Sequence, residues 1–208
     1  MKLHNSITFA TYHLTNMKLN KSNLIALFIL IVAASLYRVW DGRPMGFAPQ
    51  IAMAIFAGSI SKDKRFAFLF PVISMLISDI LYQVLYTQGL SSIKGFYGGQ
   101  WVNYLLIASV TFIGFFINKN KISQIVAGSL AGAIFYFILS NLLNWVGGGL
   151  DINNQPYPKT VDGLISCFVA ALPFFKWSVL STLLFNGLFF GSFYLLEKRM
   201  AETKSYAA

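Results

Sequence analysis

Charged side chains are scarce in this sequence. Aspartate, glutamate, lysine and arginine make up 11% of the 208 residues, whereas soluble domains carry about 25%. Hydrophobic residues account for 56% of the chain and aromatic residues for 16%. This composition is typical of proteins whose apolar segments of about 20 residues cross a bilayer. We therefore expect an all-α membrane protein whose surroundings are a lipid bilayer.

Cysteine and histidine are also nearly absent. Cys167 is the single cysteine, so the chain cannot form an internal disulfide or hold a metal through a cysteine cluster. His4 and His13 both precede the first apolar segment, which excludes a histidine-ligated haem or zinc within the membrane. The motifs of zinc proteases, serine hydrolases, dinucleotide-binding domains and P-loop ATPases are missing. We expect no enzyme activity, no metal and no cofactor.

Acidic residues are fewer than basic ones, 7 against 16, and the formal net charge is +9. In a soluble protein such a charge would point to a nucleic acid partner. Here the basic residues lie between apolar segments, as the positive-inside rule describes for cytoplasmic loops. They gather at 18–21, 62–65, 119–121 and 198–204. This pattern predicts no nucleic acid partner, six crossings, and both termini on the cytoplasmic side.

Six apolar segments are predicted to cross the membrane, at 24–37, 48–60, 66–86, 100–117, 122–145 and 177–196. A further apolar stretch at about 160–175 is short and contains Pro173. If it crossed, Lys198 and Arg199 would lie outside, so we expect a non-spanning helical segment on the outer face. The predicted organisation is a disordered cytoplasmic N-terminus at 1–22, a single transmembrane domain at 23–197 and a cytoplasmic tail at 198–208.

The first apolar segment allows two interpretations. Lys18 and Lys21 precede it, and Val32-Ala33-Ala34 resembles a cleavage site, which together fit a signal peptide. An uncleaved helix that extends to Trp40 at the interface is the interpretation we favour. Met17 is a plausible alternative start of the chain.

One carboxylate, Asp79, lies in the middle of an otherwise apolar segment. A charge at this depth costs roughly 2.5–3.5 kcal/mol on insertion scales, and such residues usually face the protein interior or a wet cavity. The predicted topology places Asp79 in the outer half of the membrane, level with polar and aromatic side chains of other segments. The candidate substrate-binding residues are Arg38, Asp79, Asn103, Tyr104, Asn141, Asn144, Trp145 and Asn186.

These residues predict a pocket that opens outward. Asparagine amides suit a neutral polar ligand, Asp79 could take a cationic group or a hydroxyl, and the aromatic rings could stack on a ring. The same residues also allow a purely structural interpretation. Asp79 can pair with Arg38 or bond Asn103, and asparagines often link helices. Likewise, small residues spaced four apart at 48–58 fit ordinary helix packing as well as the docking of a partner.

Three segments carry a resemblance to a known family: GRPMGFAPQIAMAIFAG at 42–58, PVISMLISD at 71–79 and YPKTVDGLISCFVAALPFF at 157–175. Over residues 36–197 the chain resembles an uncharacterised family of small bacterial inner-membrane proteins. Such proteins are similar to the substrate-binding S components of energy-coupling factor vitamin transporters. The resemblance implies a six-helix bundle in the bacterial inner membrane that binds a vitamin or metal ion near the outer face. It also implies a separate transmembrane coupling subunit with ATPases as a partner.

We therefore expect the chain to bind a small, vitamin-like or other polar molecule from the outer face, as the specificity subunit of a transporter. The alternative is a noncatalytic structural or docking subunit of a membrane protein complex. An enzyme that acts on lipid is the least favoured interpretation, because the apolar segments contain no nucleophile with a neighbouring base.

Overall fold

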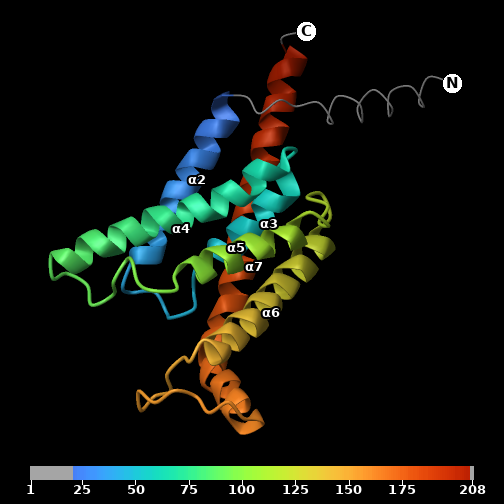
Figure 1. Ribbon diagram of the computed structural model, residues 1–208. Helices are drawn as coiled ribbons and strands as arrows, with labels where there is room; N and C mark the ends of the chain where they lie inside the picture. Colours follow the sequence, from blue (N-terminus) through green and yellow to red (C-terminus); the bar gives the residue numbers. More distant parts are fainter. Residues whose placement is uncertain (1–20, 207–208) are drawn as a thin grey trace.

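The computed structural model describes residues 21–206, and regular secondary structure in this range is helical. Six helices follow one another (Figure 1): α2 (Lys21–Val39), α3 (Gln50–Ile60), α4 (Lys64–Thr87), α5 (Trp101–Gly114), α6 (Ile122–Val146) and α7 (Val161–Tyr206). No strand occurs between residues 21 and 206, so the predicted all-α class is confirmed. The predicted disordered N-terminus at 1–22 lies almost entirely outside the described residues.

Three helices are long and apolar enough to cross a membrane: α4, α6, and the 161–199 part of α7. The other apolar helices are shorter, at Phe28–Val39, Gln50–Ile60 and Trp101–Gly114. At roughly 1.5 Å per residue, α3 extends about 16 Å, or half of a bilayer core of about 30 Å. By length and composition, the described chain therefore supplies three helices that can span and not the six predicted.

The short helix α3 forms the centre of the molecule. Residues 50–58 are all buried, and α3 packs against α4, α5, α6 and α7. Glycines allow α3 and α5 to approach closely, because a Cβ at Gly58 would lie 2.4 Å from the carbonyl oxygen of Thr111. A Cβ at Gly114 would lie 2.3 Å from the carbonyl oxygen of Ile55. The small residues of this segment therefore serve packing between helices of the same chain.

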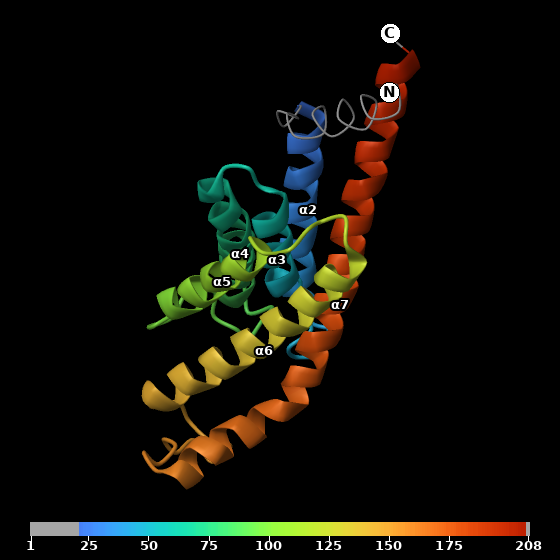
Figure 2. The ribbon, with the colours of Figure 1, turned by 90° about the vertical axis from the view of Figure 1, so that its right-hand side faces the viewer.

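The last helix differs from the prediction. We expected a separate segment at about 160–175 and a span at 177–196, but α7 is one helix of 46 residues. It bends along its length (Figure 2), and Pro173 lies inside it. Proline removes a backbone donor and clashes with the carbonyl four residues earlier, which kinks a helix without ending it here. At about 69 Å, α7 is far longer than a bilayer core of about 30 Å, so only part of it can lie across one.

The connections between helices form two groups that lie at different heights along the molecule (Figures 1 and 2). In Figures 1 and 2 the α3–α4 and α5–α6 turns lie toward the end that holds the C-terminus. The longer connections at 40–49, 88–100 and 147–160 lie toward the other end. An ion pair between Lys119 and Glu197 joins the α5–α6 turn to α7. The helices thus alternate in direction, with their basic turns at one end.

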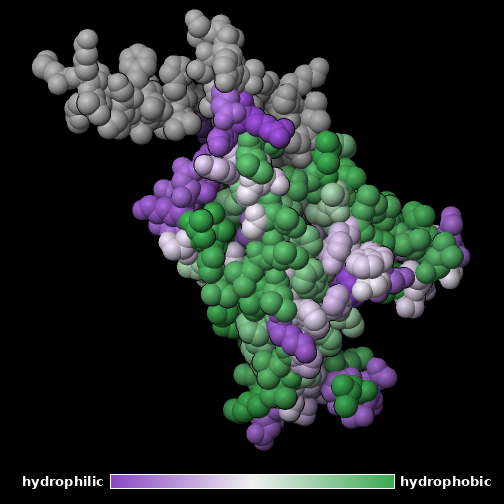
Figure 3. Space-filling model, turned by 180° about the vertical axis from the view of Figure 1, so that it is seen from behind, coloured by the Kyte–Doolittle hydropathy of each residue, from purple (hydrophilic) through white to green (hydrophobic). Residues whose placement is uncertain are grey.

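Apolar side chains cover much of the surface between these ends (Figure 3). Along one face of α7, for example, Leu180, Leu184 and Leu188 are each 51–53% exposed. Exposed leucines at this spacing form a stripe that water would not favour, whereas lipid chains would solvate it. The surface therefore agrees with the association with a membrane that the three long apolar helices indicate.

Candidate ligand-binding site

The carboxylate of Asp79 is buried and fully engaged with side chains of other elements. Its Oδ1 lies 2.5 Å from Arg38 Nη1, which makes an ion pair. Its Oδ2 accepts hydrogen bonds from Gln100 Nε2 at 2.5 Å and from the Tyr104 hydroxyl at 2.6 Å. A buried carboxylate needs such partners, because an unpaired charge is strongly disfavoured away from water. Asp79 therefore joins the end of α2 to the start of α5.

Arg38 is held in place from several sides. Its Nη1 also donates to the Ser78 hydroxyl at 2.6 Å. Its backbone carbonyl, at the C-terminal end of α2, accepts from the Tyr82 hydroxyl at 2.7 Å and from Arg43 Nε at 2.6 Å. These bonds satisfy a carbonyl that the helix itself leaves unpaired. The guanidinium therefore occupies one defined position beside α4.

The 88–100 connection folds back onto α4 to deliver Gln100. Gln100 Nε2 donates to the Gly95 carbonyl at 2.8 Å as well as to Asp79. A Cβ at Gly95 would lie 1.9 Å from the Asp79 carbonyl oxygen, so a side chain at this position would push the loop away from the helix. The close approach of the 88–100 connection to α4 therefore requires a glycine at position 95.

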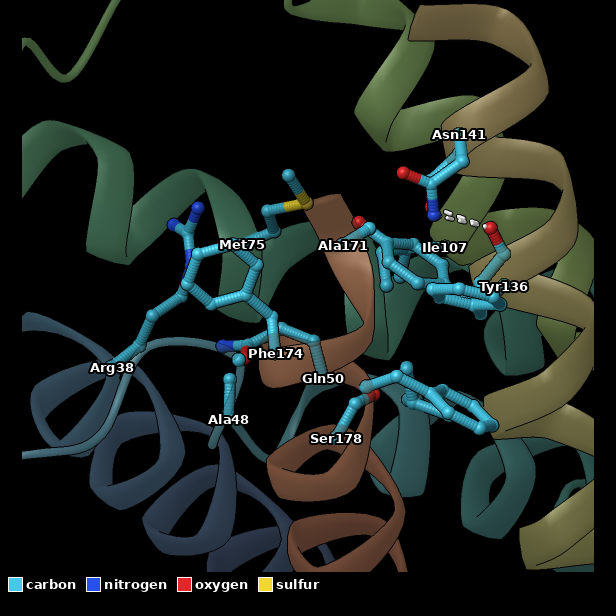
Figure 4. A pocket seen from close by; sticks show the side chains of 15 residues that line it. Arg38, Ala48, Gln50, Met75, Ile107, Tyr136, Asn141, Ala171, Phe174 and Ser178 are labelled. Atoms are coloured by element: carbon cyan, nitrogen blue, oxygen red, sulfur yellow. Dashed lines mark hydrogen bonds between the residues drawn. The ribbon is translucent and has the colours of Figure 1, made fainter. Parts of the chain in front are cut away.

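A cavity of about 300 Å³, here called the central cavity, lies next to this network (Figure 4). Its polar lining residues are Arg38, Gln50, Tyr136, Ser140, Asn141 and Ser178, and its aromatic ones also include Phe137, Phe174 and Phe175. In Figure 4, Arg38 approaches from one side and Tyr136 and Asn141 from the other, with Gln50 between them. The lining therefore draws on α2, α3, α6 and α7, together with Met75 of α4 and Ile107 of α5.

Gln50 is a polar residue of this lining whose buried amide lacks partners within the described chain. The residue is only 4% exposed, and neither its amide oxygen nor its amide nitrogen has a hydrogen-bond partner within the described chain. By contrast, Asn141 Nδ2 donates to the Phe137 carbonyl at 2.7 Å within α6. An unsatisfied buried amide costs about 1–3 kcal/mol per group. Gln50 is therefore a group that would gain hydrogen bonds from an occupant of the cavity.

Among the described residues Arg38 is the one charged residue of the lining, and its charge is balanced by the ion pair with Asp79. The remaining polar groups of the cavity are neutral amides and hydroxyls. No aspartate or glutamate among the described residues lines the cavity, and no cluster of three or more histidine, cysteine or acidic residues in the described range could hold a metal. The arrangement therefore suits a neutral or anionic molecule better than a cation.

Four of the eight candidate site residues meet in this region. Arg38 and Asn141 line the central cavity. Asp79 and Tyr104 do not line it: Asp79 forms the ion pair with Arg38, and the Tyr104 hydroxyl donates to Asp79. Three others do not line the cavity and contact other partners: Asn103 Nδ2 donates to the Tyr97 hydroxyl, Asn144 Nδ2 lies 3.6 Å from Cys167 Sγ, and Trp145 Nε1 donates to the Pro158 carbonyl at 2.8 Å.

Asn186 does not lie level with the other candidates. It is fully buried, and its Nδ2 donates to the Ser129 hydroxyl at 2.7 Å. Ser129 is separated from Asn141 by about 18 Å along α6, at roughly 1.5 Å per residue. The prediction placed Asn186 in the outer half of a helix at 177–196, but α7 begins at Val161 and carries Asn186 toward the opposite end.

Sequence reasoning missed Gln50, Tyr136, Ser140 and Ser178 as lining residues. Gln50 had one local signal, since it opens a segment whose next eight residues are all apolar or small. A glutamine at such a position must be explained by a cap, a partner or a cavity. Tyr136, Ser140 and Ser178 carry no comparable signal, because tyrosine and serine are common in membrane helices.

Comparison with known proteins places the chain in a family but assigns no activity. No curated protein and no solved structure matches it. The predicted similarity to S components of energy-coupling factor transporters therefore stays a prediction. Residues 18–204 match a family of unknown function, DUF6580, which confirms the expectation of an uncharacterised family. The match covers most of the sequence, and the chain therefore belongs to the DUF6580 family of unknown function.

Proposed function

We propose that this chain is an integral membrane protein that binds a small molecule in the central cavity from the outer face, as the specificity subunit of a transporter. The proposal includes six crossings, with the shorter helices α2, α3 and α5 completing the bundle. It also includes a bacterial inner membrane and a separate transmembrane coupling subunit with ATPases, both of which rest on the resemblance to S components.

The orientation rests on charge. The basic turns at 62–65 and 119–121 lie toward the end of the molecule that holds the C-terminus. The positive-inside rule assigns that end to the cytoplasm. The central cavity is bordered by Gly46 and Ala48 of the 40–49 connection, which lies toward the other end. A ligand would therefore reach the cavity from outside.

The observation that carries the proposal is Gln50, which lines a cavity of about 300 Å³ and whose buried amide has no partner within the described chain. Such a volume stands at the lower end of the roughly 300–1,000 Å³ of small-molecule sites. Mostly apolar walls with a few converging polar groups are also usual for such sites. A structural role alone would be served better by an apolar residue at position 50, since the Gln50 side chain makes no hydrogen bond within the described chain.

Native mass spectrometry after a mild purification tests this function. The wild-type chain is expected to carry a small molecule, and the near-isosteric variant Gln50→Met is expected to lose most of it. Thr111→Val is the matched control, because the Thr111 hydroxyl is also buried without a partner in the described chain but lies outside the cavity lining. Equal retention by all three proteins, or a wild-type chain without any bound molecule, would contradict the proposal.

A docking subunit is the second candidate, and a groove between α6 and α7 favours it. This α6–α7 groove has a volume of about 610 Å³ and is lined by Gly187 and Gly191, with nothing within 4 Å of a Cβ built at either glycine. Glycines four residues apart on an open face are suited to close contact with another helix. A stoichiometric second protein that is lost on Gly187→Leu, with no small molecule bound, would favour this candidate.

A further inference from the structure

We propose that Gln50 selects ligands that present a hydrogen-bond donor beside an acceptor on one edge of a flat ring, as in a lactam. The inference rests on the proposed small-molecule function and assigns a ligand class to the same cavity. The amide nitrogen of Gln50 is a donor, its oxygen is an acceptor, and both are buried without a partner in the described chain.

The geometry of a carboxamide determines what can satisfy both ends at once. Its donor and acceptor lie side by side in one plane, so the complementary group has an acceptor and a donor at the same spacing. Glutamine pairs in this way with the edge of adenine in nucleic acid recognition. A ligand with only an acceptor, or only a donor, would leave one end of the Gln50 amide unpaired.

The walls of the cavity favour a flat body behind that edge. Tyr136, Phe137, Phe174 and Phe175 contribute four aromatic rings to the lining. Phe137 and Phe175 lie against each other, with ring centroids 4.4 Å apart. Aromatic side chains contact flat rings over a large area by offset stacking or edge-to-face packing. A bicyclic ring fits the volume and leaves its polar edge toward Gln50.

The charge of the lining removes one class of ligand. Arg38 is the charged residue of the lining, and its counter-ion Asp79 already binds it at 2.5 Å. A cationic ligand would meet the guanidinium without a free carboxylate beside it. The selected class of ligand is therefore neutral or anionic. An unpaired Asp79 would instead have favoured a cationic ligand.

Three bicyclic probes of similar size test the inference by equilibrium dialysis against the full chain in lipid nanodiscs. 2-Quinolinone carries the N–H beside the carbonyl, N-methyl-2-quinolinone lacks only the donor, and 2-naphthylmethylamine is a cation. We expect the lactam to bind about tenfold or more tightly than its N-methyl analogue, the effect of one lost hydrogen bond with an unpaired partner. The cation is expected to bind most weakly.

Variants assign this preference to Gln50. In Gln50→Met the ratio of affinities for lactam and N-methyl lactam is expected to fall to about one, while Thr111→Val keeps the wild-type ratio. A wild-type ratio near one, or a ratio that persists in Gln50→Met, would overturn the assignment. A melting temperature is recorded for each variant. A variant that misfolds is recognised because it binds none of the probes and also has a lowered melting temperature.

A second variant separates the failure of this inference from the failure of the proposed function. Ala171→Phe adds bulk to the cavity wall and is expected to weaken every probe. If probes bind wild type without preference and Ala171→Phe weakens them, the cavity is a binding site and only the selection by Gln50 is wrong. If no probe binds, or if binding is indifferent to Ala171→Phe, both the cavity function and the inference are wrong.

Discussion

The two oxygens of Asp79 receive hydrogen bonds from Arg38, Gln100 and Tyr104. A carboxylate with these partners has exchanged its hydration for fixed donors, which makes its burial tolerable within a membrane. The structural interpretation of Asp79, a pair with Arg38, is therefore confirmed, while the alternative partner Asn103 bonds Tyr97 instead. Asp79 influences the central cavity through Arg38, whose position it fixes.

Asp79→Asn tests this role, because it preserves the size of the side chain and removes the counter-ion of Arg38. Removing one partner of a buried ion pair costs about 3–5 kcal/mol. We expect the lower end of this range, about 3 kcal/mol, because the Arg38 side chain keeps 20% of its exposure. The free energy of unfolding in detergent micelles measures the effect.

The control for this variant is Glu197→Gln, which breaks the ion pair with Lys119. The Lys119 side chain is 31% exposed, and such surface pairs contribute about 0–1 kcal/mol. A small loss in Glu197→Gln beside a large one in Asp79→Asn would match the assigned roles. Equal losses in the two variants would show that burial of the Asp79 pair has no special effect on stability.

Helix α3 shows how a short apolar helix of 11 residues becomes the core of a helical protein. Its residues 50–58 are buried on all sides, so it has no lipid-facing stripe. This explains its lack of a clear apolar face in the sequence, since a helix that is hydrophobic all round is surrounded by other helices. Small side chains at this position allow four neighbouring helices to come close.

Gly58→Ala is expected to destabilise the protein by about 1–3 kcal/mol, the usual cost of added volume in a packed core. The new methyl group would meet the backbone carbonyl of Thr111, which cannot move aside without shifting α5. Gly191→Ala is the matched control on α7, where a Cβ meets nothing within 4 Å. There, the higher helix propensity of alanine is expected to stabilise by about 0.5–1 kcal/mol. Chemical unfolding in micelles compares them, and a Gly58→Ala protein as stable as wild type would contradict close packing of α3 on α5.

Helix α7 shows a different relation between pattern and structure. Pro173 and the short apolar stretch before it predicted a boundary, yet the helix continues through the proline with a bend. The residues around that bend, Ala171, Phe174, Phe175 and Ser178, all line the central cavity. The proline therefore marks where α7 turns around the cavity and not where one element ends.

For the molecule as a whole, the alternating ends of the helices lead to a prediction about topology. Single cysteines at Asn153 and Asn120, in a Cys167→Ser background, are to be treated with a membrane-impermeant maleimide on intact cells. We expect labelling at position 153 without lysis and at position 120 only after lysis, because the basic α5–α6 turn should face the cytoplasm. A cysteine that replaces Glu202 is likewise expected to be labelled only after lysis. Labelling of 120 or 202 on intact cells would contradict six crossings with both termini inside.

Local features of the chain were sufficient to predict its helical class, the approximate boundaries of α2 to α6 and the location of its basic turns. The reason is that hydropathy, helix periodicity and charge are read over windows of a few turns. Cys167 and the two histidines likewise excluded a disulfide and a cysteine or histidine metal cluster directly from their number and positions.

Which polar side chains meet was decided only by the tertiary structure. Arg38, Gln50, Asn141 and Ser178 come from four helices, and their convergence depends on how each helix is rotated and where it crosses its neighbours. Each residue turns the helix by about 100°, so two residues at similar depth can lie on different faces. The depth of Asn103 and Asn144 along their helices therefore could not show whether their side chains line the cavity. The sequence therefore determined a helical chain with apolar segments suited to a membrane and one carboxylate among them. Packing around α3 determined that Gln50 lines the cavity with an unpaired amide, whereas Asp79 is paired with Arg38 and does not line it.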